Sequence, residues 1–231
     1  MKKYWVVCVC FLLALSFMTG CKPEPPPPPP EDLPPPPPSP EEHYNTMKGS
    51  MGQLFGDGGI TPEEGAALVS AFNGTKMQMA ASDNGRIALG MLQRDIEDTM
   101  RKSRENSRWN KVKVCCELYK ILQPGSDRYA KLERDAELMM ARPQVLVTGF
   151  VKSGNDIYAF IETTNPQTKE KTTFKIREGE EFYQPATLGS QPNTTNLLRL
   201  VRIIGDQQSV ELEYKPVNFL WEAPGPRKRQ G

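Results

Sequence analysis

The sequence contains only one histidine, His43, among its 231 residues. Ser-His-Asp and Cys-His catalytic sites each need a histidine held in the folded core, and a multi-histidine zinc site needs several. His43 instead lies at the edge of a proline-rich stretch. The sequence also lacks the glycine-rich loop that cradles a phosphate. We therefore expect no catalytic residues, no metal ligands, no cofactor and no small-molecule substrate, although residue counts leave a carboxylate pair or a Ser-Lys dyad open.

The sequence has no excess of charge of either sign. Lys and Arg together number 29, and Asp and Glu together number 28. Proteins that bind nucleic acid or anionic surfaces carry a marked basic excess, so we expect no nucleic-acid partner. The one basic cluster, Arg227 to Arg229, lies in residues 223–231, which we interpret as a disordered, solvated tail.

Cysteine is scarce, and its positions predict no disulfide framework. Cys8 and Cys10 lie inside an apolar N-terminal segment, and Cys21 follows that segment. Cys115 and Cys116 are adjacent, and a disulfide between neighbours is strained. We expect Cys115 to pack as a small apolar residue on a helix, with a bridge between two chains as the alternative.

The N-terminus has the layout of a secretory signal. Lys2 and Lys3 provide positive charge, and an apolar run of about 15 residues extends from Tyr4 to Met18. A membrane-spanning helix needs roughly 20 apolar residues. The pattern therefore predicts a signal peptide over residues 1–20.

The tetrapeptide from Met18 to Cys21 resembles a bacterial lipobox. In that motif the cysteine after a small residue is lipidated and becomes the first residue of the mature protein. The resemblance implies that Cys21 is a lipid attachment site and that acyl chains hold the protein at a membrane, because each buried methylene contributes about 0.8 kcal/mol. An ordinary signal peptide and a short uncleaved anchor are the alternatives.

Residues 21–43 are dominated by proline. Proline fixes φ and has no N–H, so such a segment joins neither a helix interior nor a sheet. It favours an extended polyproline II rod that rises about 3.1 Å per residue. We interpret it as a stiff linker that carries the rest of the chain away from the membrane, with a proline-rich ligand for an aromatic groove as the alternative.

Residues 53–64 have part of the pattern of a calcium-binding loop. Gly58 takes the position of the sharp turn, and Glu64 takes that of the bidentate ligand. Phe55, however, stands where a carboxylate is needed. A capping box that starts at Thr61, with proline at the first helical position, explains these residues better.

Residues 44–142 show helical periodicity, with apolar residues at three- and four-residue spacing. We expect four helices: from Thr61 to about Asn73-Gly74, from Gly85 to about Asn106, from Ser107 to Leu122, and from a cap at Ser126 to the residue before Pro143. The last two are predicted to form a helical hairpin.

From Pro143 the period changes to two, which indicates strands. Five strands are expected in residues 143–222: QVLVTGFV, IYAFIETT, KTTFKIRE, LLRLVRIIG and SVELEYK, the last with Val210, Leu212 and Tyr214 turned inward. Closely spaced antiparallel strands with short turns favour a small barrel or sandwich. The predicted fold class is therefore α+β, with an N-terminal helical segment followed by a small antiparallel β-barrel or sandwich of about five strands.

The first two of these strands are apolar on both faces. One face is expected to enter the core and the other to meet the helices or a partner protein. The first strand is therefore the candidate partner-binding strand, through Val145, Val147, Gly149 and Val151. Docking would use strand addition at a free edge, where main-chain hydrogen bonds provide affinity.

The strand order resembles the small periplasmic β-domain of PilP-like lipoproteins of type IV pilus assembly. It is also similar to the homology region of the inner-membrane clamp protein of type II secretion. The resemblance rests on a glycine turn from Arg177 to Glu180 and on the pattern V-x-I-x-G-D-x-x-x-V-x-L from Val201 to Leu212, over about a third of the chain. The helical residues 61–141 and the long stretch from Tyr183 to Asn196 depart from the family pattern.

The resemblance implies a scaffold in the cell envelope, lipid-anchored and facing the periplasm. Its partners would be the membrane and either a secretin or inner-membrane pilus proteins. The alternative is a generic outer-membrane or periplasmic lipoprotein that binds another envelope protein without catalysis. Lys22 favours that alternative mildly, because it stands where an aspartate favours inner-membrane retention in some bacteria.

Acylation of Cys21 provides the first test. In cells given a radiolabelled fatty acid, the protein is expected to take up label and to fractionate with membranes, and Cys21→Ser should abolish both. The matched variant Cys10→Ser should retain both, because it leaves the predicted attachment site intact. Label that persists in Cys21→Ser would contradict the assignment.

Overall fold

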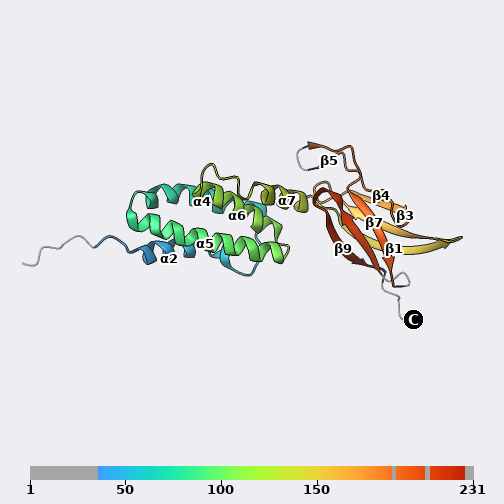
Figure 1. The fold of residues 1–231 in the computed structure, drawn as a ribbon, viewed down its shortest axis with the longest axis horizontal. Coiled ribbons are helices and arrows are strands. Elements are labelled where there is room, and N and C mark those ends of the chain that lie inside the picture. Colours follow the sequence, from blue (N-terminus) through green and yellow to red (C-terminus); the bar gives the residue numbers. More distant parts are fainter. Residues whose placement is uncertain (1–35, 189–190, 206–208, 227–231) are drawn as a thin grey trace, which may run out of the picture. The chain divides into compact units, whose positions relative to one another are not determined.

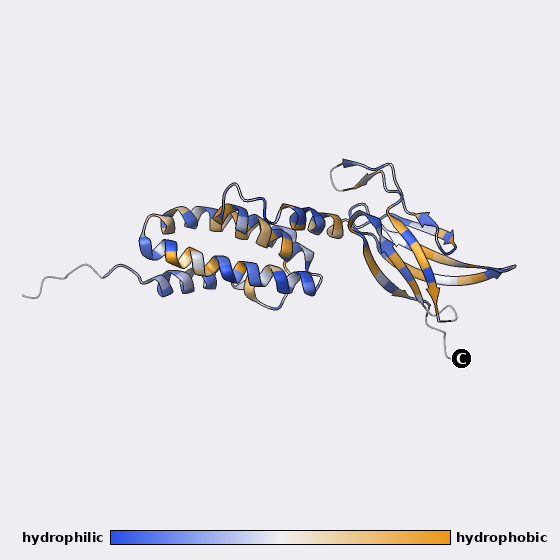
Figure 2. Cartoon of the chain, in the orientation of Figure 1, coloured by the Kyte–Doolittle hydropathy of each residue, from blue (hydrophilic) through white to orange (hydrophobic). Residues whose placement is uncertain are grey.

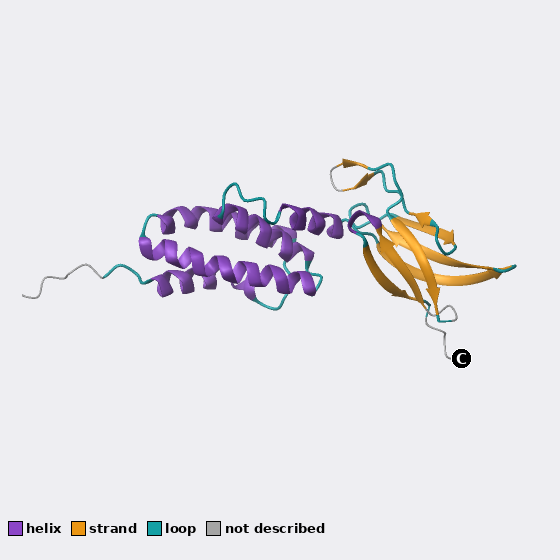
Figure 3. Cartoon of the chain, in the orientation of Figure 1, coloured by secondary structure: helices purple, strands orange, loops and turns teal. Residues whose placement is uncertain are grey.

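The computed structural model describes residues 36–188, 191–205 and 209–226. The predicted signal peptide, the lipid site Cys21, most of the proline-rich segment and the basic cluster from Arg227 to Arg229 lie outside the described residues. Helices occupy the first part of the described chain and strands the second (Figures 1 and 3). The predicted α+β class is therefore confirmed.

Six helices form in the described chain, and capping boxes start two of them. The bounds are Pro40–Ser50 (α2), Gly52–Phe55 (α3), Pro62–Ala80 (α4), Asp83–Glu105 (α5), Trp109–Leu122 (α6) and Ala130–Met140 (α7). The Thr61 hydroxyl accepts a hydrogen bond from the Glu64 N–H, and the Glu64 carboxylate accepts one from the Thr61 N–H. The predicted capping box is confirmed, and Ser39 and Glu42 form another before α2.

The first predicted helix is longer than its sequence indicates. It does not stop at Asn73-Gly74, because α4 continues to Ala80. A glycine inside a helix costs only about 1 kcal/mol relative to alanine. Phe72 and Met79, one on each side of that glycine, are both buried in the helical core, and this burial favours continuation of the helix.

Two helix starts also differ from the prediction. Residues 40–43, which the sequence assigns to the extended linker, are the first turn of α2, because Ser39 caps the helix and proline suits its first position. Ser126 does not cap the last helix, since α7 starts only after Tyr129 and has no side-chain cap. The Tyr129 ring instead packs edge-on against Tyr119 of α6, with centroids 4.7 Å apart.

The helical core centres on α5. Its predicted four-residue stripe is buried: Ala88, Leu92, Ile96 and Met100. These side chains share one hydrophobic cluster with residues of α2, α3, α4 and α6. Helices α4 and α6 pack so closely that a Cβ at Gly65 would lie 2.5 Å from a methyl carbon of Val114.

A polar cluster ties α2 to α5. Lys48 Nζ lies 2.5 Å from Asp95 Oδ2, and the Tyr44 hydroxyl donates to the same oxygen at 2.6 Å. Partial burial alone would raise the pKa of Asp95, but the hydrogen bonds from Lys48 and Tyr44 outweigh it and lower that pKa. The cluster therefore favours the ionised carboxylate in the folded state.

The C-terminal part forms nine strands in the described chain. Their bounds are Gln144–Ser153 (β1), Asp156–Thr164 (β2), Lys171–Ile176 (β3), Glu181–Phe182 (β4), Thr187–Leu188 (β5), Gln191–Pro192 (β6), Leu198–Ile204 (β7), Ser209–Tyr214 (β8) and Phe219–Pro224 (β9). One sheet has the order β1-β2-β3, a second has the order β4-β7-β8-β9, and β5 pairs with β6. All pairs are antiparallel.

The predicted barrel or sandwich of about five strands is confirmed only in part, because among the described residues no barrel closes and the strands number nine. The two larger sheets stay open while their buried residues share one hydrophobic cluster. The short β4 has two residues, too few to pair along β3, and β1 lies close to β9 without pairing with it. Strand β9 was not predicted from the sequence. Its residue Ala223, which the sequence analysis assigned to the disordered tail, is buried.

Alternating side chains hold this core together. Hydrophobic and hydrophilic residues alternate along the strands (Figure 2). Val210, Leu212 and Tyr214 of β8 are fully buried, which confirms their predicted inward direction. The Tyr214 hydroxyl reaches past the sheet and donates to the Leu138 carbonyl of α7 at 3.0 Å.

The Asp95 cluster predicts a pH dependence. The folded-state pKa of Asp95 lies below its ordinary value. The stabilisation that Asp95 contributes is therefore present above about pH 4 to 5 and is lost as the pH falls through the folded-state pKa. Asp95→Asn should lower the free energy of unfolding at neutral pH by about 0.5–1 kcal/mol and flatten its acid dependence. Urea unfolding at several pH values measures both.

The exposed Asp98 on the same helix provides the matched control, because Arg101, one turn away, is its one ion-pair partner within the described part of the chain. Asp98→Asn should change the free energy of unfolding less at every pH. An acid profile of Asp95→Asn that runs parallel to that of the native protein would show that the cluster does not stabilise the fold.

Candidate functional site

A β-bulge divides the four predicted partner-binding residues between the two faces of the sheet. Strict alternation would place all four on one face, but the β1–β2 register shifts between Val147 and Gly149. Val147 is buried in the core and Val145 packs against it. Beyond the bulge, Phe150 takes the core position, and Val151 is 37% exposed.

Apolar side chains line the opposite surface of β1 and β2, which we call the β1–β2 outer face. Ala159 and Ile161 are fully buried, so the side chains between and beside them point away from the core. The outer face consists of Leu146, Val151, Tyr158 and Phe160, none of which belongs to a core cluster. Leu146 is 57% exposed. Gly149, opposite Phe160, has open space where a side chain would stand.

Charged side chains flank the outer face on β2 and β3. Lys171 Nζ lies 2.8 Å from Glu162 Oε1 across the two strands. Lys175 Nζ lies 4.5 Å from the centroid of the Tyr158 ring and has no carboxylate partner in the described residues. The cation–π contact leaves this ammonium group available for a carboxylate of a binding partner.

The backbone edge of β1 is free of strand pairing. Within the described residues β1 pairs with β2 alone, and the β1–β2 hairpin extends beyond the neighbouring strands (Figure 1). Lysines often protect such edges from association. The other edge of this sheet carries Lys171 and Lys175 on β3, whereas the only lysine of β1 is Lys152, near the end of the strand. The β1 edge is therefore the less protected one.

Cys115 and Cys116 are packing residues. Both are fully buried and free, which confirms the prediction for Cys115. Burial raises the pKa of the Cys116 thiol to about 12, with a further rise from Glu133, and burial raises the pKa of Cys115 as well. Both thiols therefore stay protonated and unreactive at neutral pH.

The residues of the calcium-like loop have structural roles. Phe55 packs against the helical core, and the Glu64 carboxylate caps α4. No group of three or more His, Cys, Asp and Glu side chains is arranged to hold a metal ion in residues 36–188, 191–205 and 209–226. Over the same ranges, none of the helices combines the length and the apolar character needed to cross a membrane.

Sequence reasoning identified β1 but missed Tyr158, Phe160 and Lys175. The signal was present, because the strand IYAFIETT is apolar at successive positions. Which of its positions face outward depends on the register with β1 and on the bulge, and neither has a marker in the sequence.

Comparisons with protein-family models, with curated proteins and with solved structures find no match to this chain.

The bulge generates a stability test that separates core from surface. Val147→Ala should lower the free energy of unfolding by about 2 kcal/mol, because it removes buried methyl groups. Val151→Ala should change it by less than about 0.5 kcal/mol, because the side chain lies on the outer face, 37% exposed and outside the core clusters. Urea unfolding of both variants measures the difference, and equal losses would contradict the assignment of the two residues to opposite faces.

Proposed function

We propose that this protein is a cell-envelope scaffold lipoprotein whose β-domain docks a partner of a type IV pilus or type II secretion machine. Cys21 holds one end at a membrane, and the proline-rich segment provides reach. The β-domain then binds the partner by strand addition at β1. The role is adhesive and needs no catalysis.

The observation that carries the proposal is the coincidence of a free strand edge with an exposed apolar face. An extended peptide that pairs with β1 gains main-chain hydrogen bonds. Its alternate side chains would lie beside Leu146 and Val151, which are among the exposed large hydrophobic residues of the described chain. Exposed apolar groups beside an unpaired edge favour association in a way that scattered apolar residues do not.

The polar surroundings add selectivity. Lys175 lies beside the aromatic part of the outer face with its charge uncompensated in the described residues. Because Lys175 is on β3 and not on β1, only a partner that also covers the outer face could bring a carboxylate to it and gain a charge-assisted hydrogen bond. Lys152, close to the tip of the hairpin, disfavours a basic partner there.

A second candidate is a generic lipoprotein of the outer membrane or the periplasm with another envelope partner. Lys22 after the predicted lipid site favours it, because an aspartate at that position favours inner-membrane retention in some bacteria. Both candidates use the same β1 surface, so the identity of the docked protein distinguishes them.

Crosslinking in intact cells tests the proposal. A photocrosslinking amino acid at Val151 should join the protein to a secretin or to an inner-membrane pilus protein. The same amino acid at Ile87, which is 55% exposed on α5, provides the control and should not give that product. Leu146→Lys should reduce the Val151 product severalfold, because a lysine at the strand edge opposes pairing.

The outcomes distinguish the candidates. A product with a different envelope protein, sensitive to Leu146→Lys, would favour the generic lipoprotein over the pilus or secretion scaffold. Equal products from Val151 and Ile87, or a Val151 product insensitive to Leu146→Lys, would contradict docking at β1.

A further inference from the structure

A groove separates β3 from the chain that follows β4. Its volume is about 580 Å³, within the range of ligand sites in proteins. One wall is formed by side chains of β3 and the turn before it, and the other by residues 181–187 and Asn196. This second wall includes the start of the long stretch from Tyr183 to Asn196 that the sequence marks as an insertion.

Aromatic side chains form the apolar part of the groove. The rings of Phe174 on β3 and Phe182 on β4 lie 5.3 Å apart between centroids. Phe182 is buried, whereas Phe174 is only half-buried and lines the groove beside it. An apolar side chain placed here would be removed from water against two rings.

Tyr183 provides a polar group that lacks a partner. Its side chain is only 6% exposed, it lines the groove, and its hydroxyl has no hydrogen-bond partner among the described residues. No side-chain oxygen of the described residues is both buried from water and without a partner, so the Tyr183 hydroxyl is accessible to water and free to donate to a ligand, whereas that of Tyr214 donates to the Leu138 carbonyl. Burial, and then the nearby Glu170, raise the pKa of Tyr183, so the hydroxyl remains a donor.

The backbone of Tyr183 is also unusual. Its φ is +63°, a left-handed conformation that is rare for a bulky residue and costs about 1–3 kcal/mol. The Tyr183 carbonyl accepts a hydrogen bond from the Leu197 N–H at 3.0 Å, which helps to hold this conformation. Such strain is concentrated at functional sites.

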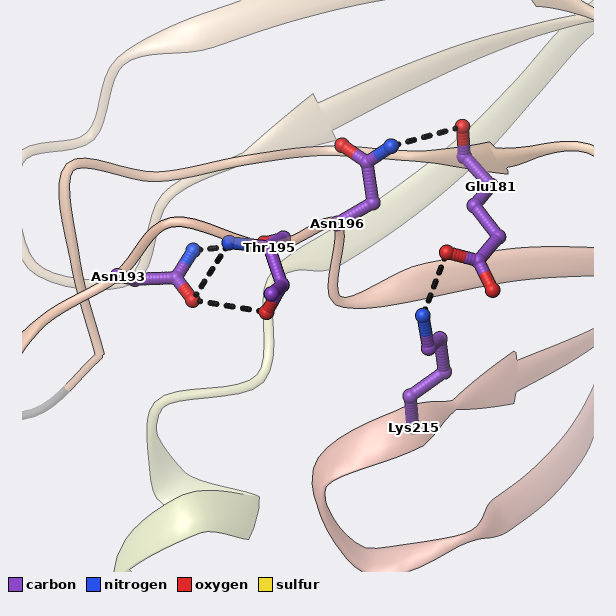
Figure 4. A network of polar contacts seen from close by, with 5 residues as sticks. All are labelled: Glu181, Asn193, Thr195, Asn196 and Lys215. Atoms are coloured by element: carbon purple, nitrogen blue, oxygen red, sulfur yellow. Dashed lines mark hydrogen bonds and ion pairs between the residues drawn. The ribbon is translucent and has the colours of Figure 1, made fainter.

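Hydrogen bonds hold the second wall in place (Figure 4). The Asn193 amide donates to the Pro185 carbonyl at 3.0 Å, and the Asn196 amide donates to the Glu181 carbonyl at 3.2 Å. The Glu181 carboxylate pairs with Lys215 at 2.5 Å. The groove is therefore preformed, which lowers the entropy cost of binding.

The charges and the free backbone groups along the groove indicate which kind of ligand it could bind. The groove is lined by two carboxylates, Glu170 and Glu181, and by no lysine or arginine. Lys215 neutralises Glu181, whereas Glu170 has no ion-pair partner in the described residues. The outer edge of β3 has no strand partner there either, so main-chain groups border the groove along one side.

We propose that the groove between β3 and residues 182–187 binds an extended segment of a partner protein with an apolar side chain next to a basic one. A backbone carbonyl of the segment accepts from the Tyr183 hydroxyl, the apolar side chain packs on Phe174 and Phe182, and the basic side chain pairs with Glu170. This site is distinct from the β1 edge and does not depend on the proposed function.

Peptide binding to the full chain in detergent tests this site. The probe is a capped peptide of alternating threonine and valine with a central leucine-arginine pair, and a second peptide carries glutamate in place of the arginine. Residue-resolved amide NMR spectra follow the titration. The arginine peptide should shift the amide signals of Phe174, Phe182 and Tyr183 and bind more tightly than the glutamate peptide.

Two variants and their controls make the test specific. Tyr183→Phe keeps the ring and should weaken the arginine peptide about 5- to 10-fold, the usual effect of one hydrogen bond. Glu170→Lys should reverse the preference between the two peptides. Tyr129→Phe, in the helical part, and Glu222→Lys, on β9, lie outside the groove and should leave both affinities unchanged.

Three results would overturn the proposal. The first is the absence of shifts at the groove at the highest peptide concentration, and the second is an affinity unaffected by both Tyr183→Phe and Glu170→Lys. The third is a set of shifts confined to β1, which would support the docking edge while assigning no ligand to the groove.

Discussion

The proposed binding surfaces of this protein depend on unpaired backbone N–H and C=O groups at the edges of two open sheets. The sheets share one hydrophobic cluster, but in the described chain no strand pairs with the outer edges of β1 and β3. Every N–H and C=O along such an edge must bond to water or to another chain. The β-domain therefore has a complete core and an incomplete ladder, and our proposals concern what completes that ladder.

The edges of β1 and β3 differ in how many lysines they carry. Lys171 and Lys175 place charge along β3, which opposes unselective pairing, while the groove beside that strand offers a shaped site. Along β1 the protection is weaker, and the bulge turns Val151 outward to join an apolar face. Bulges often re-aim a side chain near a functional surface, and here the bulge separates core residues from the candidate docking residues.

Sequence patterns predicted the elements better than their arrangement. Four-residue spacing identified the α5 stripe, and two-residue spacing identified the inward residues of β8, because burial selects apolar side chains at the period of each element. The end of α4 was missed because tertiary packing of Phe72 and Met79 outweighs the signal of Gly74. The bulge in β1 was missed because it depends on the pairing register with β2, and the groove was missed because it depends on packing between β3 and residues 181–187. The lipid site remains a prediction, since Cys21 lies outside the described residues.

Amide hydrogen exchange along β1 tests the central claim most directly. On an unpaired edge strand, successive amide groups alternate between bonding the neighbouring strand and facing outward. In the isolated monomeric protein, we predict alternating slow and fast exchange along Gly149–Ser153, with the fast amides becoming slow only in complex with the docked partner. Uniformly slow exchange along these residues in the isolated monomer would show that the edge is already paired and would contradict the account.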